Sequence, residues 1–137
     1  MKVLVDTSIW SLALRRGTPK EHELIKEFYD LIRDFRVQII GPIRQEVLSG
    51  IKSQKQFETL KSYLSAFPDL PLETSNYEKA AEFFNINRKH GIQGSNTDFL
   101  ICAVAYHRDL EIFTTDKDFA DFQQYIPIKL YLPKVSR

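Results

Sequence analysis

The sequence predicts an α/β protein whose mainly parallel sheet is covered by helices on both faces. Short apolar runs alternate along the chain with longer segments in which apolar residues recur at three- and four-residue spacing. Strands separated by helices pair in parallel, and such sheets are buried on both sides. The length of 137 residues favours one domain that spans residues 1–137. Ligands of such sheets bind beyond the carboxyl ends of the strands.

The first half of the chain is predicted to hold two strands and four helices. The strands are expected at residues 2–5 and 37–40, and the helices at 8–16, at 20–35, from Pro42 onward and near 54–65. Gly17 and Pro19 end the first helix, and Gly41 ends the second strand. Pro42 suits the first turn of a helix because its ring presets the backbone there.

The second half of the chain is predicted to be a connector followed by alternating helices and strands. The connector covers residues 66–73, the helices 75–90, 97–108 and 116–122, and the strands 111–115 and 128–132. The glycine at Gly91 ends the first of these helices. Residues 97–108 are almost wholly apolar, so periodicity does not separate a buried helix from a buried strand. Their alanine and cysteine content favours the helix.

Composition places the chain among soluble globular proteins. The net charge is +1, with 43% hydrophobic and 27% charged residues, so nucleic-acid binding would depend on local patches rather than on bulk charge. Cys102 is the one cysteine, which excludes an intrachain disulfide, fits a reducing compartment and predicts a buried, inert thiol. The first apolar run is too short for a signal peptide, and no run approaches the roughly 20 residues of a membrane span. We therefore expect a cytoplasmic protein without a membrane segment.

Four acidic residues stand where they can meet at one edge of the predicted sheet. Asp6 directly follows the apolar run VLV, and Asp116 directly follows IFTT. If both strands are parallel and central, these side chains share an edge. Asp98 lies in the first turn of the predicted helix 97–108, and Glu46 lies one turn into the helix after the second strand.

Such a cluster of carboxylates is unfavourable alone because like charges raise one another's pKa. A hard cation such as Mg²⁺ or Mn²⁺ reverses this, since it prefers oxygen ligands. Two such ions about 4 Å apart can activate a water and stabilise the leaving oxygen of a phosphodiester. The nearby hydroxyls of Thr7, Ser8 and Thr114 can hold a carboxylate in place.

Each acid also has a simpler interpretation. Asp6 can cap a helix, Asp116 can be a turn residue, Asp98 can favour the helix dipole, and Glu46 can be a solvated helix residue. Three acids at equivalent places of one predicted edge nevertheless favour a shared site. The histidines show no ligand spacing, which predicts structural roles for His22, His90 and His107.

Three segments of the chain resemble a known family. They are VDTSIW near the N-terminus, PIRQEVLSGI around Glu46, and NTDFLICAVAYHRDLEIFTTDKDF near the C-terminus. In this order they resemble the PIN-domain ribonucleases, and most closely the VapC-type toxins of toxin–antitoxin pairs. The resemblance covers nearly the whole chain and implies a three-layer α/β/α sandwich with a central, mainly parallel sheet. It also implies an endoribonuclease that depends on Mg²⁺ or Mn²⁺.

The resemblance also implies roles for particular residues and partners. The family's four metal-binding acids match Asp6, Glu46, Asp98 and Asp116, and its two hydroxyl residues match Ser8 and Thr114. Asp118 matches an extra acid found in many members. The family further implies a homodimer, an RNA substrate, and a cognate antitoxin that inserts a segment into the acidic groove.

Positive charge must flank an acidic site that binds RNA. The candidates are Arg15, Arg16, Lys20, Lys52, Lys55, Arg88 and Lys89, each of which can also be a solvated surface charge. Other functions stay open from the sequence. They are a phosphoacceptor domain of the receiver type, a PIN-domain RNA-processing nuclease that is not a toxin, and a PIN scaffold without catalysis.

Overall fold

A four-stranded parallel sheet forms the centre of the protein. The computed structural model describes residues 1–15, 19 and 22–134. The strands are β1 (Val3–Val5), β2 (Val37–Gln38), β3 (Glu111–Phe113) and β4 (Lys129–Leu130), in the order β2-β1-β3-β4. All neighbouring strands are parallel, and Val5 pairs with Phe113 at the end of β1 and β3. β1 and β3 are thus the two central strands.

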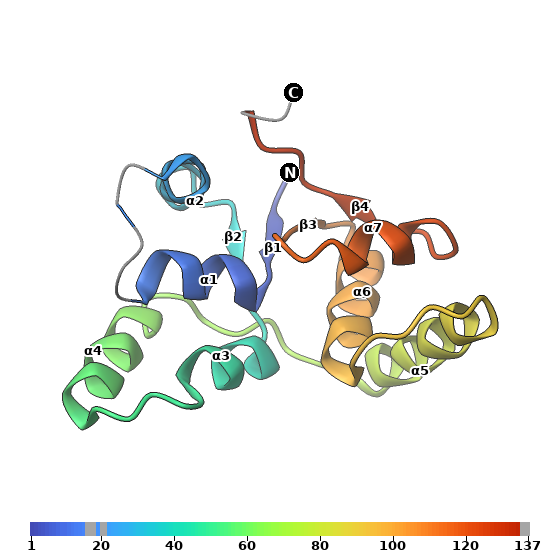
Figure 1. The fold of residues 1–137 in the computed structure, drawn as a ribbon, viewed down its shortest axis with the longest axis horizontal. Helices are drawn as coiled ribbons and strands as arrows, with labels where there is room; N and C mark the ends of the chain where they lie inside the picture. Colours follow the sequence, from blue (N-terminus) through green and yellow to red (C-terminus); the bar gives the residue numbers. More distant parts are fainter. Residues whose placement is uncertain (16–18, 20–21, 135–137) are drawn as a thin grey trace.

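Helices cover both faces of this sheet. The helices of the described residues are α1 (Thr7–Leu14), α2 (Glu23–Arg33), α3 (Gly41–Leu48), α4 (Gln54–Leu64), α5 (Thr74–Lys89), α6 (Asn96–Arg108) and α7 (Asp118–Gln123). In Figure 1, α1 and α2 lie on one side of the strands, and α5 and α6 lie on the other. The predicted three-layer α/β/α fold with a parallel sheet is therefore confirmed.

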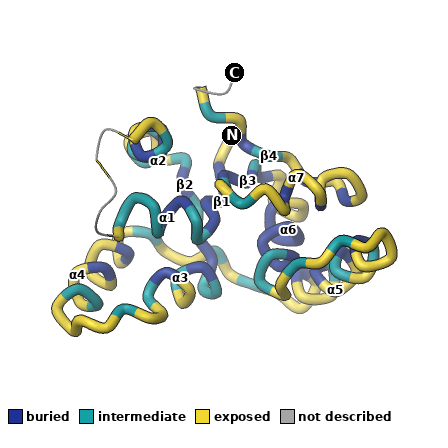
Figure 2. The backbone as a smooth tube through the Cα atoms, in the orientation of Figure 1, coloured by how far each residue is buried: buried dark blue, intermediate teal, exposed yellow. Residues whose placement is uncertain are grey.

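The core lies between the layers. The strand β1 is fully buried, and α6 is buried from Phe99 to Ala105, as the dark segments of Figure 2 show. A helix buried on all sides has no polar face, which is why its hydrophobic pattern lacks a period. The interpretation of residues 97–108 as a helix was correct. The outer helices α4 and α5 keep exposed polar faces.

The strands are shorter than the apolar runs that predicted them. β3 ends at Phe113, and the next residue, Thr114, uses its side chain in hydrogen bonds instead of extending the strand. The connector 66–73 contributes one parallel bridge, between Asp69 and Ile39, with Leu70 N–H donating to the Ile39 carbonyl at 2.9 Å. The predicted helix break at Gly17 lies outside the described residues.

Within the described residues, no helix is both long enough and apolar enough to cross a membrane.

Candidate active site

Asp6 connects the two central strands at their carboxyl ends. Its N–H donates to the Phe113 carbonyl at 2.9 Å, and the residue is only 6% exposed. It occupies the N-cap position of α1, but its side chain makes no capping hydrogen bond. Instead, Oδ2 accepts hydrogen bonds from Ser8 Oγ at 2.9 Å and from Thr114 Oγ1 at 2.8 Å. The interpretation of Asp6 as a helix cap alone is therefore wrong.

The predicted hydroxyl residues Ser8 and Thr114 lie together. Thr114 Oγ1 accepts a hydrogen bond from Asp116 N–H at 2.9 Å and lies 3.3 Å from Ser8 Oγ. Ser8 Oγ also accepts from Thr115 N–H at 3.1 Å. These bonds join the segment after β1 to the segment after β3. They fix the carboxylate of Asp6 relative to the backbone of Asp116.

Asp98 approaches the same edge from the start of α6. Its Oδ2 accepts from Ser95 N–H, and its own N–H donates to Ser95 Oγ, both at 3.0 Å. This reciprocal capping box begins the helix, so Asp98 does stabilise the helix start as well. Burial raises the pKa of Asp98; the bonds from Ser95 lower it, and the charges of Asp6 and Asp116 raise it further. That repulsion indicates that the three carboxylates share one region.

Asp116 and Glu46 complete the set of predicted acids. Asp116 Oδ1 accepts from Asp118 N–H at 2.9 Å, a turn contact, while the Asp118 side chain is exposed. Glu46 is exposed on α3, and its Oε1 accepts from Thr7 Oγ1 at 2.7 Å. Thr7 follows Asp6 in the chain, so this bond ties Glu46 to the carboxyl end of β1.

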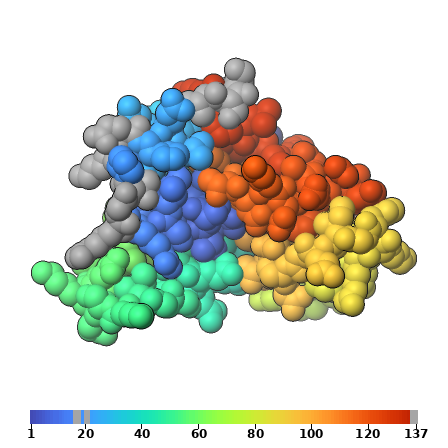
Figure 3. All heavy atoms as spheres, in the orientation of Figure 1, coloured from blue at the N-terminus to red at the C-terminus, as the bar shows by residue number. Residues whose placement is uncertain are grey.

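The space-filling view agrees with this arrangement. In Figure 3 the blue N-terminal segment adjoins teal α3, the orange segment after β3 and the gold start of α6. Segments from distant parts of the sequence thus meet on one face of the molecule.

Ser95, which orients Asp98, was not among the predicted site residues. The detectable signal was the spacing Ser-x-x-Asp over residues 95–98, which is the pattern of a capping box. The helix was predicted to begin at residue 97, whereas α6 begins at Asn96. The predicted start therefore did not put Ser95 at the N-cap position.

The four carboxylates share a pattern of hydrogen bonding that suits a hard cation. In each, one oxygen is held by a protein donor, and the other accepts no hydrogen bond from any described residue. Across the described ranges, no three His, Cys, Asp or Glu side chains form a ready-made metal cluster. Mg²⁺, however, usually binds through one or two carboxylates together with waters and substrate phosphate. The residues present therefore fit Mg²⁺ or Mn²⁺.

The histidines and the cysteine have structural surroundings. Nδ1 of His22 accepts from Leu24 N–H, the ring of His90 stacks on a tyrosine, and His107 Nδ1 lies 2.8 Å from an asparagine amide. Burial, followed by the charges of Asp98 and Asp6, raises the pKa of the Cys102 thiol far above its usual value. The thiol therefore stays protonated, in accord with the predicted inert role.

Five of the seven predicted phosphate-binding cations can be placed. The side chains of Arg15, Lys52, Lys55, Arg88 and Lys89 are exposed, and none forms an ion pair with another described residue. They are thus available to an anionic ligand. Arg16 and Lys20 lie outside the described residues.

The family model of the PIN domain matches residues 3–124. The chain belongs to the PIN domain family. The receiver-type alternative is therefore excluded, and the predicted PIN fold is confirmed. No curated protein matches the sequence.

Solved structures of PIN-domain proteins share this fold over nearly the whole chain. FitAcB from Neisseria gonorrhoeae is 20% identical, with a TM-score of 0.76, over 96% of this chain and 97% of that one. VapBC2 from Rickettsia felis, bound to a promoter DNA fragment, is 16% identical, with a TM-score of 0.76, over 96% and 98%. VapC20 from Mycobacterium tuberculosis, a toxin that cleaves the sarcin–ricin loop, is 15% identical, with a TM-score of 0.69, over 93% and 99%.

Proposed function

We propose that this PIN domain is a metal-dependent endoribonuclease and acts as the toxin of a VapBC-type toxin–antitoxin pair. The observation that supports the nuclease most directly is the convergence of Asp6, Asp98 and Asp116 from β1, α6 and β3, seen in the charge effects on Asp98. Nucleases of the PIN family use divalent metals. The fold shared with VapBC proteins and with VapC20 supports the toxin role.

Each residue has a part in this proposal. Asp6, Asp98 and Asp116, with Glu46, would hold Mg²⁺ or Mn²⁺. Each of these carboxylates has one oxygen that accepts no hydrogen bond from a described residue. When bound, the cation supplies Lewis-acid activation of water and stabilises charge on the phosphodiester.

The hydroxyls beside Asp6 and the exposed cations have supporting parts in the proposal. Ser8 and Thr114 orient the Asp6 carboxylate through their hydrogen bonds. The exposed cations, Arg15 and Lys52 among them, contact RNA phosphates and give position rather than sequence.

RNA cleavage by the purified protein tests the chemistry. We expect cleavage of single-stranded RNA with Mg²⁺ or Mn²⁺ and none with EDTA. Asp6→Asn and Asp98→Asn should each lower the rate by roughly 100-fold, because each removes a charged ligand while its amide oxygen can still accept the hydrogen bonds. Asp34→Asn, at an exposed position after α2, is the matched control and should cleave like the wild type. Cleavage that persists in EDTA or in both active-site variants would contradict the assignment.

Growth on expression tests the toxin role separately. The wild type should arrest growth, and Asp98→Asn should not. A small antitoxin that binds this protein, and a homodimer in solution, are expected from the same proposal. A harmless wild type that still cleaves RNA in vitro would favour the RNA-processing nuclease, and a protein that binds RNA without cleaving it would favour the scaffold.

A further inference from the structure

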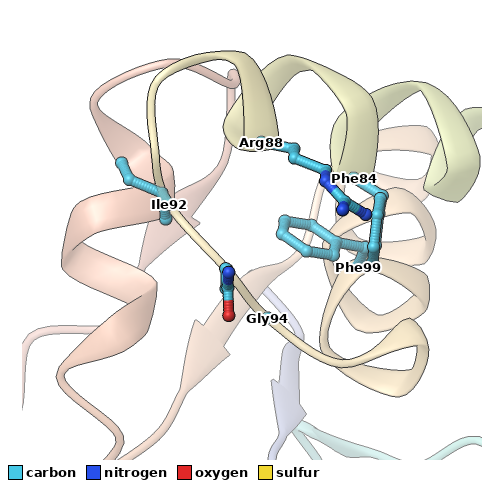
Figure 4. Close-up of a pocket in the computed structure, with 6 residues that line it drawn as sticks. Phe84, Arg88, Ile92, Gly94 and Phe99 are labelled. Atoms are coloured by element: carbon cyan, nitrogen blue, oxygen red, sulfur yellow. The ribbon is translucent and has the colours of Figure 1, made fainter.

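A pocket lies between α5, α6 and the loop that joins them. Its volume is about 230 Å³, and its lining residues are Phe84, Arg88, Ile92, Gln93, Gly94 and Phe99. Figure 4 shows the side chains of Phe84, Arg88 and Phe99 together on one side of the loop that carries Ile92 and Gly94. None of the lining residues is acidic, and Lys89 follows Arg88 in the chain, so the surroundings favour an anionic ligand over a cationic one.

Partly buried Phe84 and exposed Arg88 offer the flat surfaces on which an aromatic group could stack, while the buried Phe99 packs against Phe84. The rings of Phe84 and Phe99 meet edge to face, with centroids 5.5 Å apart and an interplanar angle of 73°. The Arg88 guanidinium lies 6.0 Å from the Phe84 ring centroid, on the same side of the pocket (Figure 4). RNA-binding sites recognise unpaired bases by stacking them on aromatic rings and on guanidinium planes.

The loop offers polar groups that can read the edge of a base. The backbone N–H and C=O groups of Gln93 and Gly94 form no hydrogen bond with any described residue. The neighbouring Ile92 N–H, by contrast, donates to the Asn87 carbonyl at 3.0 Å and anchors the loop. The Gln93 side chain is exposed and adds an amide donor and acceptor.

Gly94 fixes the position of this loop. A Cβ atom there would lie 2.6 Å from Phe122 Cζ and 2.9 Å from Phe99 Cε2, closer than real Cβ contacts allow. Only glycine therefore permits the backbone to approach these rings. The close packing of Gly94 against Phe122 and Phe99 therefore fixes this wall of the pocket.

The pocket is joined to the acidic site by one segment. Gly94 is followed by Ser95, whose N–H and hydroxyl hold Asp98. We infer that this pocket binds one unpaired base of the RNA substrate and sets a base preference next to the cleaved bond. This inference rests on the proposed endoribonuclease function.

Nucleotide binding tests the pocket without any cleavage. The four nucleoside 5′-monophosphates are added singly, in EDTA, while the backbone amide signals of Gln93 and Gly94 are followed by NMR. At least one nucleotide should shift both signals saturably, and ribose 5-phosphate should not. Phe84→Leu should weaken binding roughly tenfold, the scale of one lost base–aromatic stack. Phe57→Leu, at a partly buried position on α4, is the matched control and should bind like the wild type.

Several results would overturn the inference. They are the absence of shifts with every nucleotide, equal binding by the wild type and Phe84→Leu, and equal shifts with ribose 5-phosphate. N-acetyl-leucinamide is a probe for an apolar protein side chain. Shifts with this probe, and none with nucleotides, would overturn the base pocket in favour of a protein partner.

Cleavage of a random single-stranded RNA pool, with the ends sequenced, separates this inference from the proposed function. The wild type with Mn²⁺ should prefer one base at one position near the cleaved bond, and the ends produced by Phe84→Leu should no longer show this preference. Cleavage with an unchanged preference in Phe84→Leu would overturn the base pocket and leave the nuclease intact. No cleavage by the wild type would contradict the nuclease, while the NMR titration would still decide whether the pocket binds a base.

Discussion

At the scale of single residues, Thr114 links Asp6 after β1 to Asp116 after β3 through its hydroxyl. Its hydroxyl donates to Asp6 at 2.8 Å and accepts from Asp116 N–H at 2.9 Å. Thr114→Val keeps the shape and removes both bonds. We expect RNA cleavage to fall by about 10- to 100-fold and the Mn²⁺ concentration for half-maximal rate to rise, because the ligands lose their orientation.

Two further substitutions control this prediction. Thr114→Ser keeps the hydroxyl and should retain most activity. Thr59→Val, on the exposed part of α4, removes a hydroxyl that bonds only to the Lys55 carbonyl and should leave the rate unchanged. A Thr114→Val enzyme with normal activity and normal Mn²⁺ dependence would refute the orienting role.

The raised pKa of Asp98 predicts how stability depends on pH in the absence of metal. Because burial raises this pKa above its usual 3.8, the folded state holds the proton more tightly than the unfolded chain. The contribution of Asp98 to the free energy of unfolding therefore falls as pH rises through the interval between the two values. Asp98→Asn cannot ionise, so in EDTA it should be more stable than the wild type at pH 7. The difference in the free energy of unfolding between the two proteins should become smaller near pH 4.

Urea unfolding of both proteins at the two pH values measures this effect. A wild type that is more stable than Asp98→Asn at pH 7 in EDTA would mean that the Asp98 carboxylate is stabilised by the fold, contrary to the direction of its pKa shift.

At the scale of elements, the loop between α5 and α6 shows why one glycine cannot be replaced. Gly94→Ala would place a methyl group against Phe122 and Phe99, and the overpacking should lower the free energy of unfolding by about 1–3 kcal/mol. Gly41→Ala is the matched control. Its added Cβ would meet only Asp69 Oδ2, at 3.9 Å, so stability should change little. Chemical denaturation of both variants checks this, and equal stabilities would show that the rings can move aside.

The elements themselves could largely be predicted from sequence, and their ends could not. The alternation of patterns gave every strand and helix of the described residues in the right order. The ends depend on side-chain bonds that a pattern does not contain, such as the Thr114 hydroxyl that replaces strand pairing after Phe113. The pocket at Gly94 was not predicted either, because the close approach to Phe122 arises only in the folded chain.

At the scale of the whole molecule, the proposed site depends on β1 and β3 being neighbours in the sheet. Ser8 and Thr114 are 106 positions apart in the sequence and lie 3.3 Å apart through their hydroxyls. The sequence predicted the acids and their hydroxyls, but their meeting was conditional on both strands being parallel and central. The order β2-β1-β3-β4 meets that condition, and strand order follows from packing rather than from any local signal.

Divalent metal should therefore stabilise the whole fold and not merely the site. The charges of Asp6 and Asp116 raise the pKa of Asp98 in the folded state, and a bound cation would offset that repulsion. A cation that binds only the folded state adds about 2.7 kcal/mol to the free energy of unfolding when its concentration is 100 times its Kd. Mn²⁺ or Mg²⁺ should thus raise the Tm of the wild type, and the rise should largely disappear in Asp6→Asn and Asp98→Asn. Asp34→Asn should respond like the wild type. An equal rise in all four proteins would mean that the cations bind elsewhere, and the acidic edge would then lose its role as the metal site.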